Sequence, residues 1–211
     1  MPRKPQYTKE EIAQYGLRIV REQGMSCLTA REMAKYLGTT VAPIFVHYPS
    51  MEELKQDVRT LAQNVYREYI RQGIEYEIPL LGVGMHYIQF AKQEPELYRL
   101  LFLSDNVFDA KESHYAMEVL HYTQDLVRES IQRIYHMDAL AADHYFRDLL
   151  LVAHSFGTLL VTGGCTYTDE EIGAIFTEIS LSICKAYKEI PGLVEGEYNS
   201  DEEFRKVIYQ E

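Results

Sequence analysis

The chain has no tryptophan, only three cysteines and no long run of apolar residues. Cys27, Cys165 and Cys184 form no Cys-x-x-Cys pair and are odd in number, so neither a disulfide framework nor a zinc knuckle is expected. No stretch approaches the roughly 18 apolar residues that a transmembrane helix needs. The N-terminus also lacks the apolar segment of a signal peptide. We therefore expect a soluble, cytoplasmic protein with reduced cysteines and no membrane partner.

Strand patterns and internal repeats are also missing from the sequence. Helix signals recur instead, as capping boxes such as Thr8 with Glu11 and Thr168 with Glu171. The 211 residues, 46% of them hydrophobic, are enough for a packed core. We predict an all-α fold. Its helices should span about residues 8–24, 29–38, 40–47, 50–71, 79–93, 95–103, 114–136, 141–162 and 168–190, with a short one after residue 200.

Positive charge is scarce overall, since the net charge is −11, which argues against a nucleic-acid partner for the whole chain. The distribution reverses that conclusion. Residues 1–50 carry seven Lys/Arg against four Asp/Glu, whereas residues 51–211 carry fourteen against twenty-eight. A locally basic segment therefore precedes an acidic body, and only the first segment favours a polyanion.

The basic segment contains the pattern of a helix-turn-helix, in which the second helix lies in the DNA major groove. A first helix is expected up to about residue 38, then a three-residue turn, then a short second helix that Thr40 caps and that ends near His47. Thr29 with Glu32 and Ser50 with Glu53 have the spacing of capping boxes, and Thr40 is a further capping residue. Gly38 can end the first helix, Pro43 suits the first turn of the second helix, and Pro49 follows its end.

This motif predicts which side chains would meet DNA. Small apolar side chains at the start of the second helix can contact thymine methyl groups, and a threonine hydroxyl can serve a base or a phosphate. Side chains at the helix ends, and cations nearby, are expected at phosphates. The predicted DNA-binding residues are Thr29, Arg31, Thr39, Thr40, Val41, Ala42, Phe45, His47 and Lys55.

Three small helices followed by longer ones, with this motif near the N-terminus, resemble the tetracycline-repressor (TetR) family of bacterial transcription regulators. The resemblance is strongest at residues 8–66, and "EPELYRLLF" and "HSFGTLLVTGG" add a weaker similarity within residues 84–164. Phe45 replaces the family's usual Tyr and Met51 its usual Lys, which implies fewer phosphate contacts. The matching residues are Thr29, Ala34, Gly38, Thr40, Ala42, Ile44, Phe45, His47, Tyr48, Pro49, Ser50, Glu52 and Leu54.

The resemblance implies a helix-turn-helix DNA-binding domain at 1–50 and an effector-binding and dimerisation domain at 51–211. It implies a homodimeric, ligand-responsive repressor of double-stranded operator DNA, without a cofactor and without catalysis. An activator with the same head, or a helical binding protein whose head has lost DNA affinity, are the alternatives. The helices at 141–162 and 168–190 are apolar over more than one face, so we expect them to form the dimer interface.

The chain's 17 tyrosines are concentrated in the body, where they either fill the core or line a pocket for a partly polar small-molecule effector. The sequence leaves both uses open. The candidate pocket residues are His86, Tyr87, Phe90, Tyr98, Phe102, Tyr122 and His154.

Two other chemistries can be weighed from the sequence. "AHSFG" is similar to a hydrolase nucleophile elbow with Ser155 as nucleophile. That fold needs a histidine after the serine, whereas all seven histidines precede it. His114, Glu118 and His121 would share one helical face as a partial metal site, but no spacing names a fourth ligand. We therefore expect neither an enzyme nor a metal site.

Overall fold

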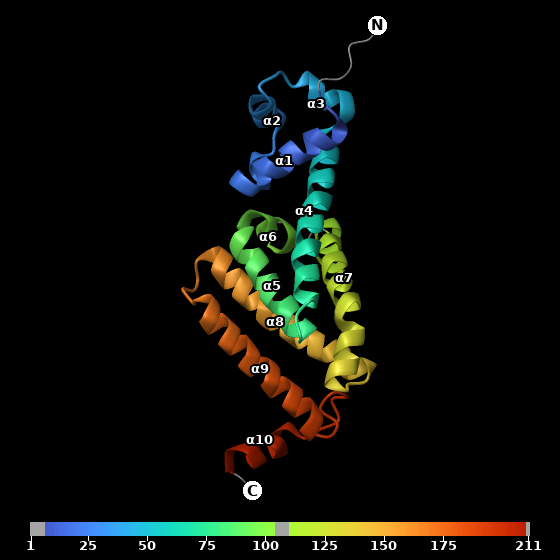
Figure 1. Ribbon diagram of the computed structural model, residues 1–211, viewed down its shortest axis with the longest axis vertical. Coiled ribbons are helices and arrows are strands. Elements are labelled where there is room, and N and C mark those ends of the chain that lie inside the picture. The colour runs from blue at the N-terminus through green and yellow to red at the C-terminus, as the bar shows by residue number, and fades with distance from the viewer. Residues whose placement is uncertain (1–6, 104–109, 210–211) are drawn as a thin grey trace.

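The computed structural model describes residues 7–103 and 110–209, of which 110–117 are described for the backbone only (Figure 1). Every regular element in these ranges is a helix, which confirms the all-α prediction. The elements are α1 (Lys9–Gln23), the 3₁₀ turn η1 (Met25–Cys27), α2 (Ala30–Leu37), α3 (Ala42–His47), α4 (Met51–Ile74), α5 (Pro79–Gln93), α6 (Pro95–Phe102), α7 (Ala110–Tyr135), α8 (Ala139–Thr162), α9 (Asp169–Glu189) and α10 (Ser200–Tyr209).

The predicted capping boxes explain where the helices start. The boxes at Thr8 and Thr168 are complete: the threonine side chain accepts from the backbone N–H of the third helical residue, a glutamate, and that glutamate's side chain accepts from the threonine N–H. At Thr29 and Ser50 only half of the capping box forms: the hydroxyl accepts a hydrogen bond from the glutamate N–H, but the glutamate side chain does not accept one from the capping residue. A single accepted bond at these two ends still satisfies one otherwise unpaired N–H.

Two predicted helix starts were wrong. Thr40 does not cap α3; Val41 occupies that position with no side-chain hydrogen bond. The α-helical φ and ψ of Val41 let its carbonyl accept from Ile44, and Pro43 needs no partner because it has no N–H. Helix α7 begins at Ala110 rather than near residue 114.

Helix α1 packs on the upper half of α4, and α5, α6 and α7 pack on its lower half (Figure 1). Gly38 ends α2 in the left-handed conformation, with φ of 64°, and turns the chain toward α3. Tyr48 then anchors the α3–α4 corner. Its buried hydroxyl donates to Asp57 Oδ2 at 2.8 Å and lies 3.2 Å from the Lys9 carbonyl oxygen.

The head formed by α1–α3 also contacts the body away from α4. Arg21 near the end of α1 donates two hydrogen bonds to the carboxylate of Glu94, between α5 and α6, at 2.8 and 3.0 Å. Tyr69 on α4 donates to Gln93 Oε1 at 2.9 Å beside this ion pair. The head is therefore held to the body at a second point besides α4.

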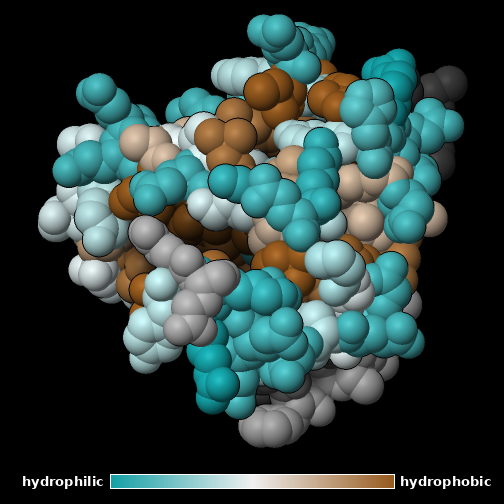
Figure 2. Space-filling view, turned by 90° about the horizontal axis from the view of Figure 1, so that it is seen from below, coloured by the Kyte–Doolittle hydropathy of each residue, from teal (hydrophilic) through white to brown (hydrophobic). Residues whose placement is uncertain are grey.

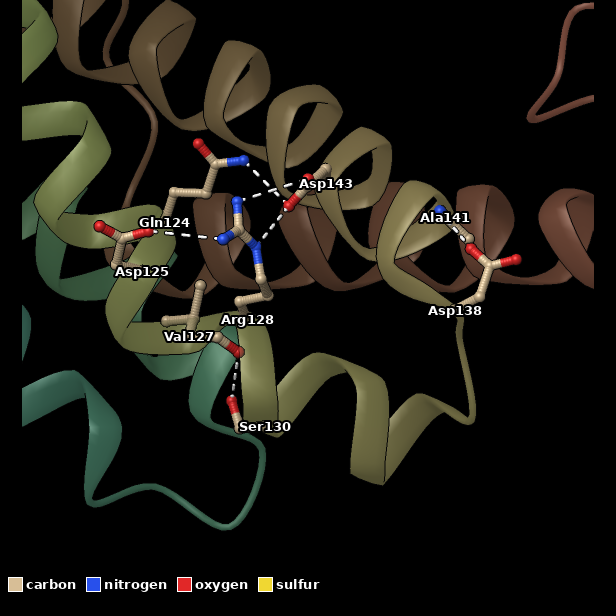
Figure 3. Close-up of polar contacts among 8 residues, drawn as sticks. All are labelled: Gln124, Asp125, Val127, Arg128, Ser130, Asp138, Ala141 and Asp143. Carbon is tan, nitrogen blue, oxygen red and sulfur yellow. Dashed lines mark hydrogen bonds and ion pairs between the residues drawn. The ribbon is translucent and has the colours of Figure 1, made fainter.

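Within the body, α5 lies between α4 and α8, and α9 packs on α5 and α8. The crossing of α7 and α8 is fixed by Arg128 and Gln124 of α7, which both donate to Asp143 of α8 (Figure 3). Asp138 caps α8 by accepting from the Ala141 N–H at 2.8 Å. These contacts set the position of α8, which carries the candidate pocket residue His154.

Helix α10 lies apart from the packed core at the end of the molecule opposite the head (Figure 1). Figure 2 looks at this end and shows brown hydrophobic surface among teal hydrophilic side chains. Phe204, Val207, Ile208 and Tyr209 are exposed on α10. Across the ranges the structure describes, no helix combines the length and the apolar character that crossing a membrane requires.

Two helix-interior glycines of the α5–α9 contact should respond oppositely to alanine. A Cβ on Gly84 would lie 2.3 Å from the ring of Phe176, whereas on Gly173 it would meet only Met85 Cε at 3.7 Å. We expect Gly84→Ala to lower the unfolding free energy by about 1–3 kcal/mol through overpacking. Gly173→Ala should raise it by about 0.5–1 kcal/mol through helix propensity. Urea denaturation measures both; equal effects would contradict this packing.

Candidate nucleic-acid interface and ligand pocket

The outer surface of the head is formed by the turn and by α3. Ile44 is fully buried and holds α3 on the core of the head, while the next two side chains, Phe45 and Val46, point outward. Val46 is 68% exposed, more than any other large apolar side chain of the head. Val41 at the start of α3 is exposed as well. Exposed apolar side chains gathered in this way make the face of α3 a candidate interaction surface.

Most of the predicted DNA-binding residues do share this surface. Thr40 and Ala42 are exposed beside Val41, and Thr39 is half-buried in the turn. Val46 is the residue that sequence reasoning missed. It could have been found from the buried Ile44, because side chains two positions apart on a helix point to opposite sides.

The predicted phosphate contacts sit around this surface. The Thr29 hydroxyl accepts from the Glu32 N–H at 3.2 Å and keeps its own proton for a further acceptor. Arg31 is exposed on α2. Lys55 on α4 is half-buried, and its Nζ lies 3.8 Å from Glu52, a weak surface pair that a phosphate can replace.

His47 has a structural role that the sequence did not indicate. Its Nε2 lies 2.8 Å from the carbonyl oxygen of Tyr7, 40 residues away. A carbonyl oxygen can only accept, so Nε2 carries the proton and donates it to Tyr7. This nitrogen is therefore used inside the head, and the predicted phosphate contact of His47 would have to come from Nδ1.

In the body, five of the seven candidate pocket residues come together, and Tyr66 of α4 joins them. Tyr66 packs edge-to-face on Tyr87, Phe90 and Phe102, with ring centroids 5.4–6.0 Å apart. Its hydroxyl lies 2.8 Å from the Thr123 hydroxyl of α7. Edge-to-face ring pairs add stability beyond that of the buried area, so this cluster helps to hold α4, α5 and α6 together.

A histidine supplies the polar partners of this cluster. His154 Nδ1 lies 2.9 Å from the Tyr87 hydroxyl and 3.0 Å from the Tyr98 hydroxyl, and the Tyr98 hydroxyl is also 3.2 Å from the His154 carbonyl oxygen. Burial raises the pKa of both phenols and lowers the pKa of the imidazole. All three groups are therefore neutral near pH 7, and Nδ1 accepts when Nε2 carries the ring proton.

The other two candidates lie elsewhere. His86 packs against Tyr76, with ring centroids 5.5 Å apart, and its buried Nδ1 has no hydrogen-bond partner among the described residues. Tyr122 lies under the guanidinium of Arg67, 5.2 Å from ring centroid to Cζ. The predicted set is thus divided among three places in the body.

The cavity beside the aromatic cluster is small. Its volume is about 20 Å³, room for a single water molecule. Phe90 and Tyr98 are fully buried, so they serve as packed core in this structure. The cavity is lined by Leu80, Val83, Gly84, Tyr87, Thr123, Phe146, Leu149, Leu150, Ala153 and Phe176.

Ser155 does not have the geometry of a nucleophile elbow. It lies inside α8, which is continuous from Ala139 to Thr162, and its hydroxyl donates to the Leu151 carbonyl at 2.8 Å. An elbow needs a strand before the serine. Gly157, two residues on, instead gives room for Tyr98, whose hydroxyl would lie 2.7 Å from an added Cβ.

The remaining candidate is the metal site on α7. The side chain of His114 is outside the described residues, so the set with Glu118 and His121 is not described. Among the side chains that are described, no group of three His, Cys, Asp or Glu residues is arranged to hold a metal ion.

Comparison with known proteins assigns no family. No protein-family model matches the chain, and no curated protein matches its sequence.

The buried imidazole gives a testable pH dependence. Because burial lowers the pKa of His154 in the folded state, the unfolded chain binds this proton more readily. The stability contributed by the neutral ring is complete above the unfolded pKa of about 6.5 and is lost as pH falls toward the folded pKa. We expect the thermal midpoint to fall between about pH 7.5 and pH 5.5, and less steeply in His154→Gln.

Ser155→Ala on the same helix serves as the control and should keep the wild-type profile. A His154→Gln profile as steep as that of the wild type would show that this ring does not titrate with unfolding.

Proposed function

We propose that this protein is a cytoplasmic, homodimeric, ligand-responsive DNA-binding regulator of the TetR kind, acting as a repressor. The observation that carries the proposal is the exposed face of α3. A short helix, anchored by one buried side chain and by a fixed corner at Tyr48, presents apolar and hydroxyl side chains outward from a basic segment. This is the arrangement by which a recognition helix enters the major groove.

The chemistry of this face suits DNA. Val41, Phe45 and Val46 can contact thymine methyl groups, and Thr40 can donate to a base or a phosphate. Arg31 and the local surplus of basic residues supply phosphate contacts. A purely structural role would leave the exposed apolar side chains of α3 unexplained.

The dimer surface is proposed on α8 and α9. Leu140, Leu151 and Leu159 are exposed along one side of α8, and Leu181 is 67% exposed on α9. Two neighbouring helices that each keep apolar side chains in solvent form the halves of a four-helix bundle when paired about a two-fold axis. Such a dimer presents two recognition helices related by symmetry.

Selection from random duplex DNA tests the proposed function. We expect the selected site to be a pseudo-palindrome, because a two-fold dimer places its two α3 helices in successive major grooves. Thr40→Ala and Val41→Ala should change base preference. Lys55→Ala should weaken binding on all sequences and reduce the salt slope by about one.

The matched control is Lys206→Ala, an exposed lysine on α10, at the end of the molecule opposite the head and outside the proposed dimer helices. It should leave DNA affinity and its salt dependence unchanged. If no sequence is enriched by selection, or if both lysine variants behave alike, the head does not read DNA as proposed.

The dimer is tested separately by charge insertion. We expect Leu151→Glu and Leu181→Glu each to convert the dimer to monomer, because each would bury an unpaired carboxylate at the interface. Sedimentation velocity measures the mass. Leu126→Glu places the same charge on an exposed apolar position of α7 and should keep the dimer; a dimer that survives both first substitutions would place the interface elsewhere.

A further inference from the structure

Two buried hydrogen-bond donors on α4 have no acceptor among the residues that the structure describes. Gln63 is 5% exposed, and its Nε2 has no hydrogen-bond partner within the described part of the chain. The Nε of Arg67 is likewise buried and without a partner there. Residues four apart on a helix lie on the same face, so the two donors are neighbours. Buried N–H groups left unpaired are uncommon and destabilise the fold, so a pair of them requires an explanation.

The surroundings of these donors are aromatic. Arg67 lies over the ring of Tyr122 on α7. One residue before Arg67, Tyr66 packs on Phe102, with ring centroids 5.5 Å apart, and lies 2.8 Å from the Thr123 hydroxyl. The contact with Tyr122 places the guanidinium of Arg67 where α4 meets α7. This is a place for a molecule that has an apolar body and an acceptor at one end.

Charge narrows the class of acceptor. The guanidinium of Arg67 makes one neutral hydrogen bond, from Nη1 to Asn64 Oδ1 at 3.1 Å, and among the described residues no carboxylate pairs with it. The outer nitrogens of this half-buried guanidinium reach solvent, but the group is a cation, so an anionic acceptor binds its buried Nε more strongly than a neutral acceptor does. A carboxylate accepts at both oxygens and forms the stronger, charge-assisted bonds.

We propose that an organic carboxylate with an aromatic or aliphatic body binds here, accepting from Gln63 Nε2 and Arg67 Nε and packing against Tyr122. As the effector of the regulator, this ligand rests on the proposed function; as a binding site, it rests on the two donors alone. Its position on α4 gives the regulatory consequence. A ligand that binds between α4 and α7 acts on the helix that carries the DNA-binding head.

The test uses benzoate, phenylacetate and octanoate as probes, with benzyl alcohol, phenylethanol and octanol as their neutral counterparts. In thermal-shift and calorimetric titrations we expect at least one carboxylate to bind the full-length protein and its alcohol to bind at least tenfold more weakly. Gln63→Leu and Arg67→Met should each weaken the binding of that carboxylate by about tenfold or more, the ratio that corresponds to losing a hydrogen bond to a charged group.

A second readout separates ligand binding from a structural role. Gln63→Leu should raise the thermal midpoint of the ligand-free protein by about 2–4 °C, because it removes a buried donor that has no partner. Gln72→Leu, the same exchange at an exposed position near the end of α4, should change neither the midpoint nor the affinity. A substitution that improves the free protein and abolishes binding is the signature of a site built for a ligand.

The outcomes are distinct. If none of the three carboxylates binds, or if Gln63→Leu binds them as the wild type does, the inference is overturned. If a carboxylate binds through both donors but no DNA sequence is enriched, the site stands and the regulatory role is refuted. If the protein binds both a carboxylate and a selected DNA, the carboxylate should weaken DNA binding by the same factor by which the DNA weakens carboxylate binding.

Discussion

The continuity of α4 is the constraint on which the rest of the structure depends. Its 24 residues, about 36 Å at the ordinary rise per residue, carry the head at one end and form a wall of the body at the other. Val58 and Leu54 pack under the head, and Tyr66 and Ile70 are buried in the body. No loop separates the two halves, so a displacement of the lower turns is passed to α3 as a rotation of one rigid element.

The body surrounding α4 is closed rather than open, and the reason is the pairing of its tyrosines. A buried phenol destabilises the core unless its hydroxyl has a partner. Here Tyr66 uses Thr123, and Tyr87 and Tyr98 use His154, so the rings can pack at core density. Only about 20 Å³ remains empty beside them. A ligand that enters this body must displace packed side chains, and the unpaired donors of α4 are the groups that gain most from its arrival.

Much of the fold followed from local signals, because capping residues, prolines and left-handed glycines act within a few positions of the helix end they set. The boxes at Thr8 and Thr168 and the turn at Gly38 are examples. One local prediction was wrong: α3 is preceded by Val41 rather than by Thr40 as its cap, because Pro43 has no N–H that a capping side chain could satisfy. Five of the predicted pocket residues do come together, but their hydrogen-bond partners could not be predicted, since Tyr87 and His154 are 67 residues apart and the partner of each hydroxyl is decided by tertiary packing. No sequence pattern marked Gln63, because only the folded surroundings of a side chain decide whether its donor has a partner.

The two attachments of the head give coupling a direction. If α4 alone joined head to body, the head could follow any motion of that helix. The ion pair between Arg21 and Glu94 adds a second attachment at the junction of α5 and α6, and both partners hold it with two hydrogen bonds. In the proposed mechanism, a ligand that separates α4 from α7 while α6 stays in place would tilt the head about Arg21 rather than carry it along. In the proposed dimer, tilting about a fixed point would change the separation of the two α3 helices, which is the quantity that the proposed operator DNA would select.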